Sequence, residues 1–337
     1  MFIVESYTLA VVFCLITMLC WGSWANTQKL LQGKWRFELF YWDYVIGIFI
    51  FSLLAAFTLG SFGEGGRSFL QDFAQAEGSN IRNAFFGGVI FNLANILLTA
   101  AIAGAGMAVA FPVGIGIALI LGVLLNYLLA SKGNVTLLSI GVLLVTLAII
   151  INAIAYRKKE KTSDEGDHQA SVKWIVISVI AGILMSLFYP FVASGMDLEN
   201  FVSPASGKMT PYTAVVVFST GILLSNLIFN SILMRRPLEG SPVKYKDYFT
   251  GKIGIHLVGV LGGAIWGLGN LFNLIAAGKA GPAISYGLGQ GATLVAALWG
   301  VLIWKEFAGG SLLVRKLIVG MFVLFIVGLG LIIRAGG

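Results

Sequence analysis

Four of the asparagines inside the long apolar runs of this sequence form two closely spaced pairs, where a polar side chain needs a specific reason. Asn95 and Asn270 lie near the middle of two such runs, with Asn92 three residues before the first and Asn273 three residues after the second. Residues three apart share a helical face, and an amide offers donors and acceptors without charge. The pattern suits a neutral polar solute, although hydrogen bonding between packed helices would use the same side chains.

A second set of polar groups follows the asparagines along the chain. Tyr286 and Gln290 are four residues apart and share a helical face. The glycines around Gly114 and Gly289 are predicted to interrupt their helices and to leave backbone groups free to face a solute. We therefore expect Tyr286 or Gln290, or both, to contact a substrate.

Tryptophans gather near the N-terminus, where Trp21 and Trp24 are followed by Asn26. Tryptophan at a membrane–water interface is ordinary, but two so close together could also stack on a flat or ring-shaped solute. Trp266 lies deeper in its apolar run, where an interfacial role is less expected.

Ionisable residues in the apolar runs are few. Asp43 stands just inside the second run and is a candidate proton carrier, because burial favours the protonated form of a carboxyl group. A helix-end carboxylate stabilised by the local dipole is the alternative. Glu306 follows Lys305 at the end of the ninth run and is a second candidate for proton coupling, with an interfacial salt pair as the default. A lone His256 is more often a packed polar residue.

Composition explains why these residues stand out. Of 337 residues, 58% are hydrophobic and 11% are charged, and the mean hydropathy is +0.91. A soluble enzyme, a nucleic-acid-binding protein and a disordered chain are all excluded on this basis. A bilayer-spanning helix takes about 20 apolar residues. Ten continuous apolar runs are present, at about 7–26, 40–60, 84–103, 106–130, 135–155, 173–194, 212–233, 254–278, 281–304 and 313–333.

Continuously apolar runs predict helices and not strands, so the expected fold is an all-α membrane protein with ten transmembrane helices. A basic stretch divides the chain into a first five-helix repeat, 1–156, a linker, 157–172, and a second five-helix repeat, 173–337. Sixteen of the 22 basic residues lie in or beside the odd-numbered loops, which leaves six on the other side. This bias predicts cytoplasmic odd loops and both termini outside.

The two halves resemble each other. Residues 87–119 and 262–294 align without a gap at an offset of 175, and 12 of the 33 positions are identical. The matches include Asn95 with Asn270 and Gly88 with Gly263. Because the offset spans five helices, an odd number, the repeats are predicted to be inverted, as in alternating-access transporters. Shared low complexity of membrane helices is the competing explanation.

Motifs of soluble catalysis are absent from the sequence. It has no Walker A motif, no His-Glu-x-x-His, no Cys-x-x-Cys and no Gly-x-Ser-x-Gly. We therefore expect a non-enzyme without cofactor or metal site.

A set of short motifs resembles one known family. They are the opening Met1 to Ser6, Trp21-Gly22-Ser23-Trp24, Tyr41-Trp42-Asp43-Tyr44, Gly87-Gly88 through Asn95, Leu125-Asn126-Tyr127, Ser186 through Tyr189-Pro190, Gly269-Asn270 and Glu306. Together they resemble the ureide permease family of the drug/metabolite transporter (DMT) superfamily, which is related to glucose/ribose-type sugar porters. The similarity runs over nearly the whole chain.

The resemblance implies a DMT-like fold of two inverted five-helix halves, a substrate role for Tyr189 in its motif, and secondary, proton-coupled uptake of small polar compounds. Plant members carry allantoin and nucleobase-like ureides, and the neighbouring branch carries sugars. This sequence has a shorter central loop, and Trp24-Ala25-Asn26 stands where plant members have Trp-Pro-Ala. Its compact form resembles bacterial members.

The sequence thus predicts a secondary active transporter of the plasma membrane, here a bacterial inner membrane. The expected partners are the lipid bilayer, a small uncharged polar solute and a coupling proton, without nucleic acid. A ureide or nucleobase is placed ahead of a sugar. A membrane receptor or partner subunit that binds without transporting is the alternative of another class, and both a monomer and a homodimer remain open.

Overall fold

The computed structural model describes residues 1–31, 33–63, 65–105, 107–160, 172–238 and 240–337. This part of the chain is all-helical and contains no strand, only an isolated bridge between Met196 and Met209. Each predicted apolar run corresponds to helix. The long elements are α1 (Tyr7–Ser23) continued by α2 (Ala25–Leu30), α3 (Phe37–Phe57), α5 (Gly78–Ala105), α6 (Met107–Leu129), α7 (Val135–Glu160), α8 (Val172–Ser194), α9 (Pro211–Arg235), α11 (Ile253–Ala280), α12 (Pro282–Gln290) with α13 (Ala292–Leu298) and the π-helix η1 (Trp299–Ile303), and α14 (Leu312–Arg334).

Nine of the helices within these described ranges are long and apolar enough to cross a membrane. Ten were expected. The tenth expected run corresponds to α6, of which the stretch Val113–Leu129 counts as a shorter apolar helix. Two further short helices, α4 (Phe69–Gln75) and α10 (Tyr245–Phe249), lie in the connections. The predicted linker 157–172 begins as the last turn of α7, and its residues 161–171 lie outside the described part.

Local sequence explains several helix starts. The Ser6 side chain accepts a hydrogen bond from Leu9 N, and the Thr210 side chain caps α9 with Pro211 at its first position. Ser311 caps α14 through Val314 N. Such residues satisfy backbone N–H groups that have no partner within the helix, so polar residues at the ends of apolar runs set where the spans begin.

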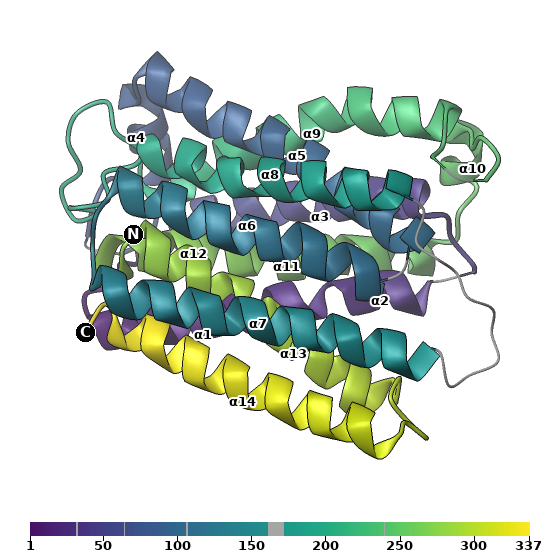
Figure 1. Ribbon diagram of the computed structural model, residues 1–337. Helices are drawn as coiled ribbons and strands as arrows, with labels where there is room; N and C mark the ends of the chain where they lie inside the picture. The colour runs from purple at the N-terminus through teal and green to yellow at the C-terminus, as the bar shows by residue number, and fades with distance from the viewer. Residues whose placement is uncertain (32, 64, 106, 161–171, 239) are drawn as a thin grey trace.

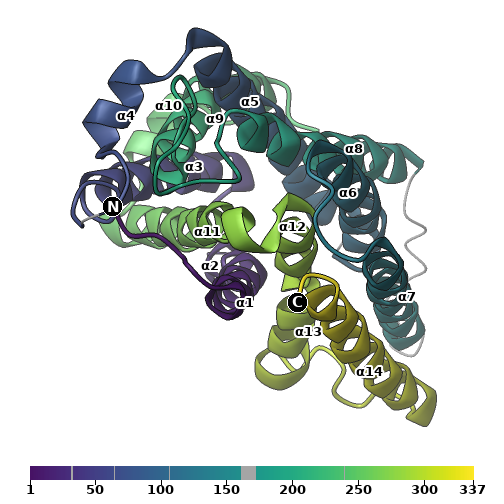
Figure 2. The same cartoon turned by 90° about the vertical axis from the view of Figure 1, so that its left-hand side faces the viewer.

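The helices lie side by side in one bundle, and both termini are at the same end of it (Figure 1). Figure 2 looks along the helix axes from that end: α7 and α14 form one flank, and α3, α5 and α9 lie on the other side. The helices of the two halves interleave. α5 packs along α8 and α9, α11 packs along α1 and α3, α6 packs along α8, and α7 packs along α14. The proposed halves are therefore not separate packing units.

Glycines allow the closest crossings. A Cβ added to Gly88 would lie 2.0 Å from the backbone O of Phe218, where α5 crosses α9. A Cβ at Gly263 would lie 1.9 Å from the backbone O of Tyr44, where α11 crosses α3. Small residues at helix interfaces let membrane helices approach at backbone distance, which is the structural part of the glycine pattern.

The predicted helix interruption occurs in only one of the two runs. α12 ends at Gln290 and α13 begins at Ala292, with Gly291 between them, and the helix then continues as η1. In contrast, α6 runs unbroken past Gly114 and Gly116, so the interruption predicted there is wrong. Gly114 instead lies against α8, where its carbonyl O would be 2.5 Å from a Cβ at Gly182.

Candidate substrate cavity

A cavity of about 670 Å³ lies among α1, α5, α6, α8, α11 and the broken span α12–α13. It reaches the surface at the end opposite the termini, where exposed Gly33 and Gly240 form part of its rim. The volume is within the range of small-molecule sites. Its lining residues are Trp21, Trp24, Ala25, Gln28, Lys29, Gly33, Trp35, Arg36, Phe37, Phe91, Asn95, Leu98, Thr99, Ile102, Ile115, Met185, Phe188, Gly240, Trp266, Gln290, Ala292, Thr293 and Glu306.

Aromatic rings line the deep part of this cavity. Trp21 and Trp266 are nearly parallel, with an interplanar angle of 8° and ring centroids 5.7 Å apart. Phe91 packs on Trp266 at 4.3 Å, and Phe188 meets Phe91 edge-on at 5.1 Å. Such a layer offers flat apolar faces to a ring-shaped solute.

The polar groups beside the aromatic layer are neutral. Asn95 Nδ2 donates to the hydroxyl of Tyr41 at 3.1 Å, and Gln290 and Thr293 line the cavity from the broken span. Among the residues that the structure describes, the buried indole N–H of Trp21 has no hydrogen-bond partner. These groups could bind a neutral solute without balancing a charge.

Charged lining residues lie toward the mouth and are paired. Lys29 forms an ion pair with Glu306, whose second oxygen accepts a hydrogen bond from Tyr156. Arg36 pairs with Glu38. The mouth therefore presents ion pairs. The sequence favoured an interfacial salt pair for Glu306, and the structure has one, with Lys29 as the partner and not the neighbouring Lys305.

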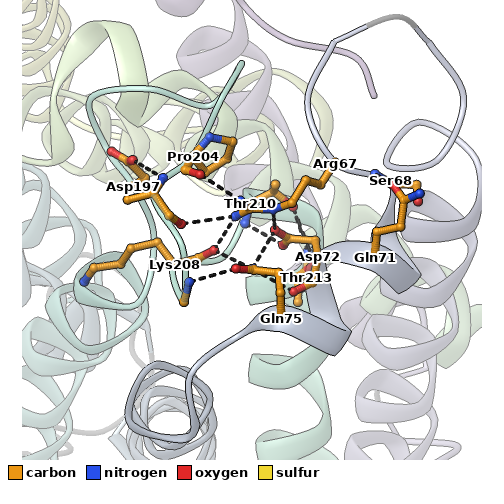
Figure 3. Close-up of polar contacts among 12 residues, drawn as sticks. Arg67, Ser68, Gln71, Asp72, Gln75, Asp197, Pro204, Lys208, Thr210 and Thr213 are labelled. Carbon is orange, nitrogen blue, oxygen red and sulfur yellow. Dashed lines mark hydrogen bonds and ion pairs between the residues drawn. The ribbon is translucent and has the colours of Figure 1, made fainter.

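The opposite end of the bundle is closed by a polar network that Figure 3 shows. Arg67 Nε donates to Asp72 Oδ1 at 2.9 Å, and Thr210 N donates to Asp72 Oδ2 at 2.7 Å. Arg67 Nη2 also donates to the carbonyl of Lys208 at 2.7 Å. The Asp72 carboxylate is fully buried, so the segment 195–210 is bound firmly to α4.

A second hydrogen-bonded layer joins α8, α11 and α12. The Tyr189 hydroxyl and Ser285 Oγ are 2.8 Å apart, and Ser285 Oγ donates to Asn273 Oδ1 at 2.8 Å. All three side chains are buried. Tyr189 and Asn273, both predicted to contact substrate, thus bind each other's helices and are not among the cavity-lining residues.

The remaining predicted residues divide between cavity and packing. Trp21, Trp24, Asn95, Trp266 and Gln290 line the cavity. The others do not: Asn92 donates to Ser225, Tyr286 donates to the carbonyls of Ala118 and Met185, Asn26 accepts from Trp304, and the Asn270 amide is buried without a hydrogen-bond partner within the described chain.

Asp43 is also outside the lining. It is 1% exposed. Its Oδ1 accepts a hydrogen bond from the Tyr248 hydroxyl at 2.6 Å and lies 2.8 Å from His256 Nδ1. Asp43 is thus enclosed by the start of α11 and by α10, at the same end as the cavity mouth. The described residues contain no cluster of side chains able to hold a metal ion.

Sequence reasoning missed several lining or neighbouring residues, among them Phe91, Trp35 and Tyr248. Phe91 had a usable signal, because it is the repeat equivalent of Trp266. Trp35 and Tyr248 had none, because they lie in short connections between spans, where no periodicity indicates a direction.

Comparison with known proteins identifies the family. The ureide permease family model matches residues 40–175 and 167–335. Ureide permease 1 of Arabidopsis thaliana is 24% identical over 389 residues, covering 100% of this chain and 99% of the relative. Probable ureide permease A3 of Vigna unguiculata is 24% identical over 372 residues, covering 92% and 98%. A chain of one solved crystal structure has the same fold, with a TM-score of 0.59 at 16% identity over 95% of this chain and 96% of that one. The protein therefore belongs to the ureide permease family and is a membrane transporter, not an enzyme.

Proposed function

We propose that this protein takes up a small, uncharged, polar solute, ureide-like or nucleobase-like, by secondary active transport with alternating access. The observation that carries the proposal is the cavity, whose deep part combines flat aromatic faces with neutral amides. It is open at one end of the bundle and closed at the other by a hydrogen-bonded network. The relatives named as ureide permeases support the ureide class.

The polar lining supports a solute rich in carbonyl and N–H groups. Asn95, Gln290 and Thr293 can each donate and accept, and Trp21 has a free N–H among the described residues. A sugar is the alternative solute, since its hydroxyl groups could use the same amides. A transported sugar would also agree with the proposed relation to sugar porters of the DMT superfamily.

Helix packing supports two inverted five-helix repeats, with α6 as the tenth span. If the halves exchange, α1 corresponds to α8, α3 to α9 and α5 to α11. The contact of α5 with α8 then corresponds to that of α11 with α1, and the contact of α5 with α9 corresponds to that of α11 with α3. The closest glycine crossings, at Gly88 and Gly263, follow the same exchange. Repeats of this kind provide two conformations of one molecule.

Charge supports a placement in the plasma membrane with the cavity open to the cytoplasm. The mouth lies among the odd-numbered connections, including Gly33 and Gly240, which carry most of the basic residues. Both termini are at the other end (Figure 1) and are proposed to lie outside. A bacterial inner membrane is the membrane that we propose.

We propose that a proton drives uptake and that Asp43 carries it. A buried carboxyl group near a transport cavity is suited to that role. Glu306, the other candidate, is already neutralised by Lys29, which favours Asp43. We expect Asp43→Asn to abolish concentrative uptake while exchange continues. If the variant keeps both concentrative uptake and exchange, Asp43 does not have this role.

Radiolabelled uptake into proteoliposomes tests the proposal. The panel is allantoin, uracil, glucose, ribose and rhamnose, with an imposed inward proton gradient, with and without an uncoupler. Uncoupler-sensitive accumulation of allantoin or uracil is expected. Accumulation of a sugar alone would favour the alternative solute, and uptake that only equilibrates would indicate a facilitator. Folded protein that moves none of the five would favour a receptor.

A further inference from the structure

The Asp43 carboxyl group is bound on one oxygen and unoccupied on the other. Oδ1 receives the Tyr248 hydroxyl and faces His256 Nδ1, whereas Oδ2 is buried with no hydrogen-bond partner in the described chain. Leaving a buried carboxylate oxygen unsatisfied is costly. This asymmetry leaves one oxygen of the group available for a proton or for a new donor.

Close helix packing makes the contact between Asp43 and His256 possible. Asp43 is on α3 and His256 is on the first turn of α11, and they are 213 residues apart in sequence. A Cβ added at Gly259, one turn beyond His256, would lie 2.4 Å from the Asp43 Cβ. A larger residue at position 259 would push α3 away, so the backbone itself is shaped around this pair.

Trp35 lies between the pair and the cavity. It lines the cavity and meets the His256 ring edge-on, with centroids 5.4 Å apart at 83°. Its indole N–H is also near the Asp43 carboxyl group but makes no hydrogen bond of good geometry within the described part. The indole N–H of Trp35 is thus an unsatisfied donor near a carboxyl group whose Oδ2 is an unsatisfied acceptor. A small movement of Trp35 would join them.

Three side chains lie close to the Asp43 carboxyl group and can stabilise its charged form. They are Tyr248 of α10, His256 of α11 and Trp35, which precedes α3. Burial, with the charge of Asp43, raises the pKa of Tyr248, so its hydroxyl keeps its proton and donates. On the nearby start of α3, Arg36 is paired with Glu38, and Lys252 offers its carbonyl to His256 N.

We infer that Asp43 and His256 together hold the transported proton, and that Trp35 is the positioning residue that links their protonation to the cavity. This inference rests on the proposed function and deepens it. With one proton the pair is neutral as a whole. When that proton leaves for solvent at the cavity mouth, the pair retains one negative charge in a buried position, which is costly. A movement of the Trp35 N–H toward Asp43 Oδ2 offsets this cost and changes the cavity wall.

Transport measurements test the pair through coupling and not through folding. Proteoliposomes with a one-unit inward pH gradient and radiolabelled allantoin or uracil allow about tenfold accumulation for one proton per solute. We expect His256→Gln to reduce the accumulation ratio to one while exchange of preloaded solute continues. His168→Gln, at the chain's other histidine, is the matched control and should accumulate like wild type.

Tyr248→Phe provides a second, milder variant. It removes a donor to the charged carboxylate, so the pH of half-maximal uptake should move upward. Trp fluorescence gives a readout without substrate, because a protonated imidazole ring quenches an adjacent indole. Quenching on acidification should be smaller in His256→Gln and in Trp35→Phe, and unchanged in His168→Gln.

The outcomes separate this inference from the proposed function. If wild-type protein and His256→Gln accumulate the solute equally and with the same pH profile, the inference is overturned and the proposed function stands. Accumulation lost in Glu306→Gln but kept in His256→Gln would assign the proton to the other carboxylate. If wild-type protein neither accumulates nor exchanges any solute of the panel, the proposed function fails and the inference fails with it.

Discussion

Phe91 and Trp266 occupy equivalent positions in the two halves, 175 residues apart, and their rings touch with centroids 4.3 Å apart. Both line the cavity. A two-fold axis between inverted repeats would bring equivalent residues together in this way. The contact therefore supports the proposed repeat architecture.

The glycine crossings should be intolerant of even one methyl group. Gly88→Ala and Gly263→Ala would each place a Cβ within about 2 Å of a backbone carbonyl oxygen, which cannot move without shifting a helix. We expect a loss of about 1–3 kcal/mol of stability for each variant, seen as a lower midpoint of thermal unfolding in detergent. Gly320→Ala is the control, because nothing lies within 4 Å of its added Cβ. Equal melting of all three variants would contradict the packing.

Asn95 should contribute to solute affinity. Asn95→Leu removes an amide that lines the cavity, and one lost hydrogen bond of about 0.5–1.5 kcal/mol raises KM about two- to tenfold. Uptake kinetics with the solute identified in the panel would measure it. Asn83→Leu is the control on the same helix, since Asn83 bonds Ser194 near the closed end. An unchanged KM in both Asn95→Leu and Gln290→Leu would remove these amides from the site.

Trp21 can act through its ring or through its N–H, and two variants separate them. Trp21→Phe keeps a flat ring and loses the donor, whereas Trp21→Leu loses both. If the solute stacks on this ring, stacking of about 1–3 kcal/mol predicts that Leu raises KM at least about fivefold more than Phe does. The measurement is uptake of uracil over a concentration series. The same KM in both variants would show that the hydrogen bond alone matters.

The closed end should open when the Asp72 network is weakened. Arg67→Gln removes the Nε donor at 2.9 Å and the contact with the Lys208 carbonyl, which stabilise closure (Figure 3). The native thiol of Cys14 is fully buried beneath this end. In a Cys20→Ser background, an impermeant thiol reagent applied at the closed end should modify Cys14 about fivefold faster in Arg67→Gln. Arg82→Gln, an exposed arginine of α5, should leave the rate unchanged.

Much of the fold was predictable because the bilayer imposes its own length and satisfaction rules. About 20 apolar residues are needed to cross it, and backbone groups in lipid must bond within the segment. The predicted runs consequently agree with the helices within a few residues at most ends, as with 173–194 and α8 (Val172–Ser194). Helix interruption was harder to predict, because glycine permits a break at Gly291 and equally permits close packing at Gly114.

Candidate site residues were predictable in type but not in direction. The sequence marked Asn95 and Asn270 as equivalent, yet only Asn95 lines the cavity. Equivalent residues differ because the bundle is open at one end and closed at the other, and a linear pattern contains no information about which end is open.

The sequence by itself determined the membrane class, the positions of the apolar runs, the internal repeat and the family resemblance. Each of these follows from local composition and spacing. Only the tertiary structure decided that Tyr189 and Asn273 join in a hydrogen-bonded layer, that Lys29 pairs with Glu306, and that His256 meets Asp43 from 213 residues away. Those contacts depend on how interleaved helices are rotated about their axes, and that rotation is set by packing among all the helices together.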